Sequence, residues 1–123
     1  MNILLVEDND DVSCITVEYL QELGHQAVAV ADAEEALARL KNERFDAVMT
    51  DIRLPGMSGI ELTRSLARDY PNLPVVIASG YGTLNLEFLL GDKSRSVFVL
   101  PKPYDLPDLE RTLNEAAAIT QAT

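Results

Sequence analysis

Short runs of apolar residues recur along the chain, and longer segments of mixed polarity separate them. The runs are rich in valine, isoleucine and leucine, and several are unbroken by any polar residue. Unbroken runs of this length are typical of β-strands that are covered on both faces. They predict strands at residues 2–6, 26–30, 45–50, 74–78 and 96–100.

The intervening segments have the spacing and the terminal residues of helices. Asp32 and Glu35 have the spacing of a capping box at a helix start, and Ser58 and Glu61 repeat it. In the first segment, Gly24 is placed to end a helix. The apolar residues that fall on one face of that helix are Val12, Ile15, Tyr19 and Leu23.

Proline and aspartate mark the bounds of the third and the final helical segments. The third helix is expected to end before Pro71, and the final helix to begin with Asp105 as its N-cap and Pro107 in its first turn.

Residues 83–90 fit two patterns, since leucine and phenylalanine alternate there as in a strand but are also spaced as in a helix. We expect a short helix, because glycines bracket the segment.

Strands that alternate with helices predict an α/β fold. The order is (βα)₅, and right-handed crossovers make a doubly wound, five-stranded parallel sheet the simplest arrangement. The expected strand order is 2-1-3-4-5, the flavodoxin-like one. Residues 1–123 show no linker, repeat or composition change, so we expect a single domain with no output domain.

Composition excludes several classes of function. A formal net charge of −10 argues against a nucleic-acid surface, and no apolar stretch approaches the roughly 20 residues that cross a bilayer. Cys14 is the single cysteine, which fits a reducing compartment, and we expect a cytoplasmic protein. Cys14 is expected at a core or boundary position, and His25 in solvent.

Charged residues follow the apolar runs at the point where each predicted strand ends. Asp51 closes the third run, Glu7 and Asp8 follow the first, and Lys102 follows the fifth. In the expected strand order, these ends meet at one crevice. Three carboxylates there carry about −3, which Mg²⁺ and a lysine would balance at about +3. Mg²⁺ suits carboxylate oxygens, water and phosphate.

A carboxylate balanced in this way can attack phosphorus, and Asp51 is the candidate nucleophile. Metal and lysine would stabilise the phosphoryl oxygens during in-line transfer. Ser79, at the end of the fourth run, could donate a hydrogen bond to the same group. Taken singly, Asp8 could be a helix cap, Lys102 a solvated side chain and Ser79 a turn residue, but their joint placement favours a phosphoacceptor site.

At these residues the chain resembles the receiver domain of bacterial two-component response regulators. The resemblance covers essentially the whole chain. Its strongest elements are Leu5-Val6-Glu7-Asp8-Asn9, the run from Thr50 to Gly59, and Lys102-Pro103. It implies that Asp51 accepts a phosphoryl group from a histidine kinase, that Glu7 and Asp8 hold Mg²⁺ with Asp51, and that Ser79 and Lys102 contact the phosphoryl oxygens. It also implies a usually cis bond before Pro103.

Two positions depart from the pattern of this family. Receivers usually carry Tyr or Phe three residues before the lysine, where the chain has Val99, with Phe98 expected on the opposite face. Tyr81 is either a substitute or a packing residue. The second departure is Arg53, a position that the resemblance links to the Mg²⁺ site and to phosphoryl lifetime. The segment around Tyr81 resembles a receiver subgroup that lacks the usual aromatic.

The leading interpretation is a signalling domain whose only catalysis is its own phosphoryl transfer and slow autodephosphorylation. Its expected partners are a sensor histidine kinase or phosphotransfer protein, and a downstream protein on the face from the fourth strand to the final helix, with a homodimer possible. The competing interpretations are an aspartyl-phosphate phosphohydrolase, a constitutive binding module and a flavin-binding protein. The candidate apolar partner surface comprises Leu84, Leu86, Phe88, Leu89 and Leu90.

Overall fold

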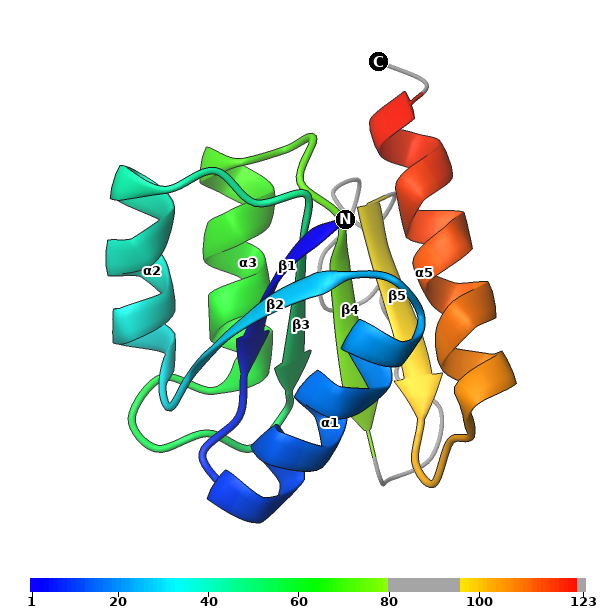
Figure 1. The fold of residues 1–123 in the computed structure, drawn as a ribbon. Coiled ribbons are helices and arrows are strands. Elements are labelled where there is room, and N and C mark those ends of the chain that lie inside the picture. Colours follow the sequence, from blue (N-terminus) through cyan, green and yellow to red (C-terminus); the bar gives the residue numbers. More distant parts are fainter. Residues whose placement is uncertain (80–95, 122–123) are drawn as a thin grey trace.

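The computed structural model describes residues 1–79 and 96–121, in which strands and helices alternate (Figure 1). The strands are β1 (Asn2–Val6), β2 (Gln26–Val30), β3 (Ala47–Asp51), β4 (Val75–Ser79) and β5 (Val97–Pro101). The helices are α1 (Asp10–Glu22), α2 (Ala33–Asn42), α3 (Gly59–Asp69) and α5 (Leu106–Gln121). The short helix expected at 83–90, the apolar surface there and Tyr81 lie outside the described residues.

The five strands form one parallel sheet in the order β2-β1-β3-β4-β5, as the sequence predicts. Register places Val6 beside Thr50 and Asp51 beside Ala78, so β1, β3 and β4 end close together. Because all strands run in the same direction, the residues that follow them collect at one edge of the sheet. We call this the carboxyl edge.

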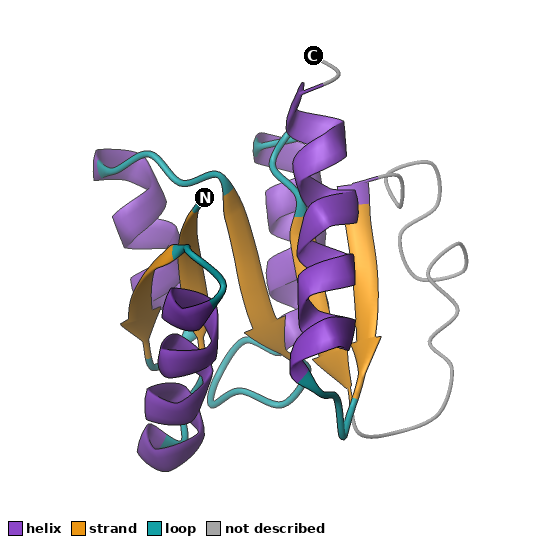
Figure 2. Ribbon diagram, turned by 45° about the vertical axis from the view of Figure 1, so that its right-hand side comes forward, coloured by secondary structure: helices purple, strands orange, loops and turns teal. Residues whose placement is uncertain are grey.

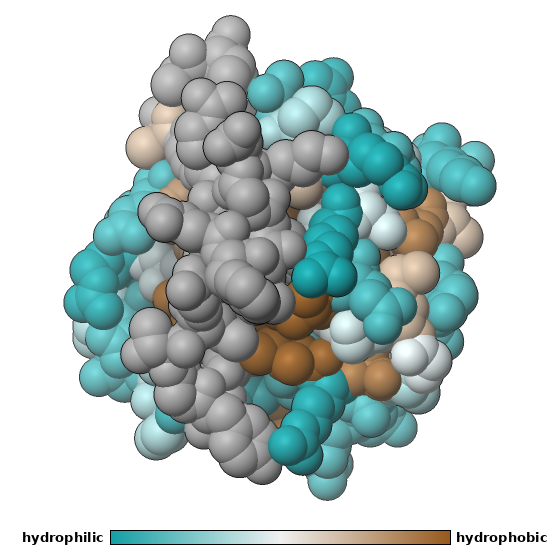
Figure 3. Space-filling model, turned by 180° about the vertical axis from the view of Figure 1, so that it is seen from behind, coloured by the Kyte–Doolittle hydropathy of each residue, from teal (hydrophilic) through white to brown (hydrophobic). Residues whose placement is uncertain are grey.

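The sheet separates two apolar cores, each covered by a pair of helices (Figures 1 and 2). On one face, Leu20 of α1 and Leu109 and Leu113 of α5 pack against side chains such as Ile3 and Met49. Helices α2 and α3 cover the other face, where the partly buried hydrophobic residues include Ile52, Leu54 and Met57. Figure 3 shows apolar surface on the rear of the molecule. Strands covered on both faces explain the unbroken apolar runs of the sequence.

The predicted helix caps at Asp32 and Ser58 are confirmed. Asp32 Oδ1 accepts from the Glu35 amide at 2.8 Å, and Ser58 Oγ from the Glu61 amide at 3.2 Å. At the final helix, Asp105 Oδ1 accepts from the Asp108 amide at 2.9 Å.

The cap of α1 is Asn9, whose side chain accepts from the amides of Asp11 and Val12. Asp8 is therefore not used as that helix cap.

The orientation of α1 differs from the one that its apolar stripe suggests. Val12, Ile15 and Tyr19 are 40%, 49% and 36% exposed, whereas Thr16 and Leu20 are buried. Thr16 tolerates burial because its hydroxyl donates to the Val12 carbonyl at 2.7 Å, which satisfies the polar group within the helix.

The expectation that Cys14 is a core or boundary residue is wrong, because this cysteine is exposed.

Candidate functional site

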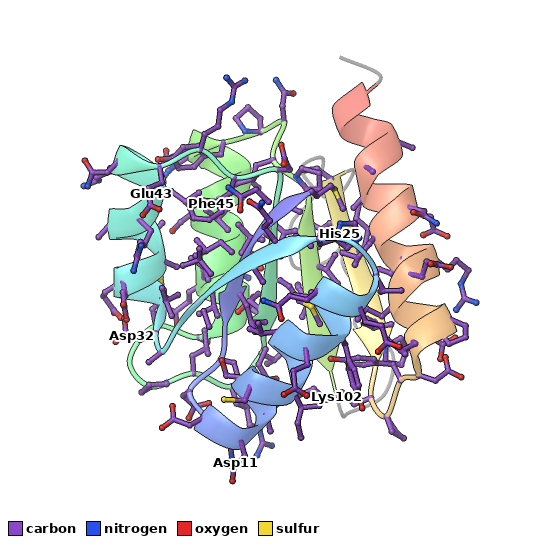
Figure 4. The ribbon with its side chains drawn as sticks, viewed as in Figure 1. Asp11, His25, Asp32, Glu43, Phe45 and Lys102 are labelled. Atoms are coloured by element: carbon purple, nitrogen blue, oxygen red, sulfur yellow. The ribbon has the colours of Figure 1, made fainter. Side chains whose placement is uncertain are left out.

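The candidate site lies at the carboxyl edge of the sheet. Glu7 directly follows β1, Asp51 is the last residue of β3, and Lys102 directly follows β5. Figure 4 shows Lys102 at this edge, close to the end of β5. The described fold thus brings together three residues that are far apart in the sequence.

Asp51 is held at both oxygens of its carboxylate. Oδ1 accepts from the Ile52 amide at 2.7 Å, and Oδ2 accepts from Lys102 Nζ at 3.0 Å. The side chains of Lys102 and Asp51 are 32% and 22% exposed, so the ion pair remains open to solvent. A charged nitrogen at this distance stabilises negative charge that develops at Asp51.

Glu7 is buried beside this ion pair, with 8% of its surface exposed. Burial raises the pKa of its carboxyl group, and the negative charge of Asp51 and a hydrogen bond with Asp8 raise this pKa further. A main-chain hydrogen bond at Asn9 and the charge of Lys102 act in the opposite direction. The site therefore holds more negative charge than Lys102 alone balances, and a further cation would favour the ionised form of Glu7.

A small cavity of about 20 Å³ lies among these groups, and Glu7, Asp51 and Lys102 are among the residues that line it. This volume is comparable with that of one enclosed water molecule. A larger hollow of about 590 Å³ lies elsewhere, lined by residues that include Phe45 and Tyr70. It contains none of the predicted site residues.

The donor set fits Mg²⁺, although the expected three-acid cluster is not assembled. Within residues 1–79 and 96–121, no group of three or more His, Cys, Asp and Glu side chains is arranged as a metal site. Mg²⁺ normally binds through one or two carboxylates and keeps several waters. Glu7 and Asp51, which line one cavity, satisfy that requirement. Asp8 is exposed, next to Glu7.

The remaining predicted site residues lie in different surroundings. Arg53 is exposed, in the loop after β3. Ser79 ends β4, but its side chain lies outside the described part of the chain. Val99 is half-buried, and Phe98 packs against the core under α1 and α5, as expected for the opposite face. The bond between Lys102 and Pro103 is cis, which agrees with the resemblance.

Tyr104 was not anticipated from the sequence, yet it lines the same small cavity as Asp51 and Lys102. Burial raises the pKa of its phenol, whereas hydrogen bonding with the Thr16 side chain and the charge of Lys102 lower it. The sequence signal that could have identified Tyr104 is its position as an aromatic residue two positions after Lys102. Its neighbour Thr16 lies on α1, a contact that the linear sequence does not reveal.

Comparison with known proteins gives a consistent result. Residues 3–114 match the family model described as response regulator receiver domain. The chain is 39% identical over 106 residues to the sensor protein TorS of Escherichia coli (strain K12), covering 84% of this chain and 11% of TorS. It is 35% identical over 107 residues to the response regulator receiver protein CpdR of Brucella abortus (strain 2308), covering 87% of this chain and 88% of CpdR.

Among solved structures, the signal receiver domain of an HD domain-containing protein from Pseudomonas fluorescens Pf-5 has the same fold. The TM-score is 0.88 at 24% identity, with 99% of this chain and 98% of that chain covered. None of the described helices is long and apolar enough to cross a membrane.

Proposed function

This chain belongs to the response regulator receiver domain family, and we propose that its Asp51 accepts a phosphoryl group from a sensor histidine kinase or a phosphotransfer protein. The observation that carries the proposal is the ion pair between Lys102 Nζ and Asp51 Oδ2 at 3.0 Å, beside a buried glutamate. The two side chains come from the ends of different strands and are both accessible. A carboxylate in this setting is a competent nucleophile toward phosphorus.

The transfer step exchanges one bond to phosphorus for another. A carboxylate oxygen of Asp51 forms a P–O bond while the P–N bond of the donor phosphohistidine breaks, and the donor imidazole keeps the electron pair. Lys102 then moves from Asp51 Oδ2 to the phosphoryl oxygens, and the Ser79 hydroxyl donates to the same group. The protein contributes mainly position and charge, as expected for phosphoryl transfer.

Glu7, Asp8, Asp51 and Arg53 are the proposed Mg²⁺ site. Arg53 can contribute only through its main-chain carbonyl, since a guanidinium group has no acceptor. Bound Mg²⁺ supplies positive charge to the phosphoryl oxygens. The support for this assignment is the raised pKa of Glu7, caused by burial and by Asp51, because a cation at this point favours its charged form.

Phosphorylation is proposed to shift a two-state equilibrium in the surface from β4 to α5, where a downstream protein or a second copy of the chain would bind. Residues 1–123 are proposed to act as one receiver domain in the cytoplasm, with no catalysis beyond self-phosphorylation and slow autodephosphorylation. The partner determines whether Asp51 receives the phosphoryl group or passes it on. TorS and CpdR are named as a sensor protein and a response regulator receiver protein.

The test is an amide NMR titration with Mg²⁺ and then beryllofluoride, which mimics a phosphoryl group on a carboxylate. We expect the wild type to respond to Mg²⁺ near Glu7 and then to beryllofluoride near Asp51 and Lys102. Asp51→Asn should lose the second response. Asp69→Asn is the matched control, because Asp69 is an exposed residue at the end of α3. A beryllofluoride response that persists in Asp51→Asn would contradict the proposal.

A further inference from the structure

Thr50, the residue before the candidate phosphoacceptor, is a buried polar residue near the end of an apolar run. It lies on β3 with 1% of its surface exposed. A buried hydroxyl group needs a hydrogen-bond partner, and Thr50 Oγ1 donates to the main-chain carbonyl of Asp51 at 2.9 Å. The side chain of Thr50 therefore holds the peptide group that begins at Asp51.

The other buried threonines of the described chain satisfy their hydroxyl groups in a different way. Thr16, Thr63 and Thr112 lie in helices, and each donates to the carbonyl four residues earlier, at distances between 2.7 and 2.9 Å. Those hydrogen bonds stay within one turn of the residue's own helix. Thr50 lies in a strand and bonds forward to Asp51, so its hydroxyl group acts on the residue that carries the proposed chemistry.

The peptide group that Thr50 holds is also bound to the Asp51 side chain. A peptide group is planar, so the direction of the Asp51 carbonyl fixes the direction of the Ile52 N–H. That N–H donates to Asp51 Oδ1 at 2.7 Å. The carboxylate is planar as well, so the position of Oδ1 restricts that of Oδ2, which accepts from Lys102 Nζ at 3.0 Å. One peptide plane and one carboxylate plane thus connect the Thr50 hydroxyl group to the oxygen that faces Lys102.

The start of α3 limits how far this peptide group can move. Gly59 lies so close to it that an added Cβ would overlap the main-chain oxygen of Asp51. The Gly59 amide also donates to the Ile52 carbonyl at 2.8 Å. Close packing of main chain excludes large displacements but does not orient the Asp51 carbonyl, whereas the hydrogen bond from Thr50 is directional.

We propose that Thr50 is a positioning residue for phosphoryl transfer, which acts through the Asp51–Ile52 peptide group to aim the Asp51 carboxylate. The inference rests on the proposed phosphoacceptor function. Because the Ile52 amide engages Oδ1, Oδ2 is the oxygen presented toward Lys102 and toward an incoming phosphoryl group. The rate of transfer depends on the alignment of the reacting atoms. Loss of the Thr50 hydroxyl group therefore slows transfer although Thr50 itself does not touch the phosphoryl group.

The experiment compares the wild type with Thr50→Val, which removes the hydroxyl group at similar size, and with Thr50→Ser, which keeps it. Thr112→Val is the matched control, because Thr112 is a buried threonine that donates to a main-chain carbonyl at 2.9 Å on α5 and does not line the cavity at Asp51. Each protein is phosphorylated with phosphoramidate and Mg²⁺, and its intact mass is followed to obtain the saturating rate and the half-saturating donor concentration.

A second measurement is made on the unmodified proteins. The chemical shift of the Ile52 amide proton and its exchange with solvent report its hydrogen bond to Asp51 Oδ1. The melting temperature reports stability alone.

We expect Thr50→Val to lower the saturating rate by roughly tenfold, since a displacement of about 1 Å can cost a factor of about 100, and to leave the half-saturating concentration close to the wild-type value. Its Ile52 amide should shift and exchange faster. Thr50→Ser and Thr112→Val should match the wild type in both measurements, whereas a merely structural role would lower the melting temperatures of Thr50→Val and Thr112→Val alike and leave both measurements unchanged.

The outcomes that contradict the inference differ from the one that contradicts the proposed function. A wild-type rate in Thr50→Val, or an equal loss of rate in Thr50→Ser, would overturn the inference alone. A slower Thr50→Val with an unchanged Ile52 amide would also overturn it, because the effect would not then act through this peptide group. Absence of phosphorylated wild-type protein would overturn the proposed function, and the inference with it.

Discussion

Gly59→Ala tests whether the loop after Asp51 must approach α3 as closely as the structure shows. Gly59 is the first residue of α3, and its amide donates to the Ile52 carbonyl at 2.8 Å. A Cβ added at Gly59 would overlap the main-chain oxygen of Asp51 and lie 2.8 Å from the Ile52 Cα. Every one of these neighbours is main chain, so none can turn aside as a side chain could. The added methyl group must displace the main chain at Asp51 and Ile52, where β3 leads into the following loop.

The expected loss of stability follows from two opposing effects. Forcing an extra carbon into a packed site costs about 1–3 kcal/mol. Alanine is favoured over glycine within a helix by roughly 0.5–1 kcal/mol, and only part of that gain is realised at the first helical residue. The net loss is then about 1.5 kcal/mol. For a chain of 123 residues, this corresponds to a melting temperature lower by roughly 6 °C.

The assay combines thermal unfolding with beryllofluoride binding. Gly24→Ala is the control: Gly24 has φ +92° with no atom within 4 Å of an added Cβ. That variant should lose about 1–2 kcal/mol from left-handed backbone strain, yet bind beryllofluoride as the wild type does. Gly59→Ala should lose both stability and binding. Unchanged stability and binding in Gly59→Ala would refute the reasoning, because the main chain would then have room for the methyl group.

Three further predictions concern Glu7, Arg53 and His25. Glu7→Gln should stabilise the metal-free protein as pH rises above the ordinary value of 4.5, because the raised pKa of Glu7 makes its ionisation costly in the fold. Mg²⁺ should stabilise this variant less than the wild type in melting experiments. Arg53→Ala should change the rate of dephosphorylation more than Mg²⁺ affinity, since Arg53 is exposed two residues after Asp51, in the loop after β3, and equal hydrolysis rates would contradict this.

Burial, followed by the charge of the Met1 amino group that lies 2.9 Å from Nδ1, lowers the pKa of His25. Stability that depends on neutral His25 is therefore present above about pH 6.5 and declines as pH falls below it. His25→Gln should flatten this part of a urea-unfolding profile, and an unchanged slope would count against the assignment.

The sequence alone was sufficient for the framework of this protein. Apolar runs locate the strands because a strand covered on both faces has no polar side to show. Asp32, Ser58 and Asp105 mark helix starts because a cap depends only on amides two or three residues away. In a parallel sheet, the residues that follow strands must share one edge, so Glu7, Asp51 and Lys102 could be grouped before any distance was known.

Only the tertiary structure decided how the helices and loops meet around that edge. The stripe of Val12, Ile15 and Tyr19 establishes an amphipathic pattern, but the rotation of α1 about its own axis depends on what it packs against. Tyr104 and Thr16, which are far apart in the chain, line one small cavity, and the 3.0 Å separation of Lys102 Nζ from Asp51 Oδ2 depends on the register of three strands. Local patterns specify elements, whereas contacts between distant loops arise only when the whole core is packed.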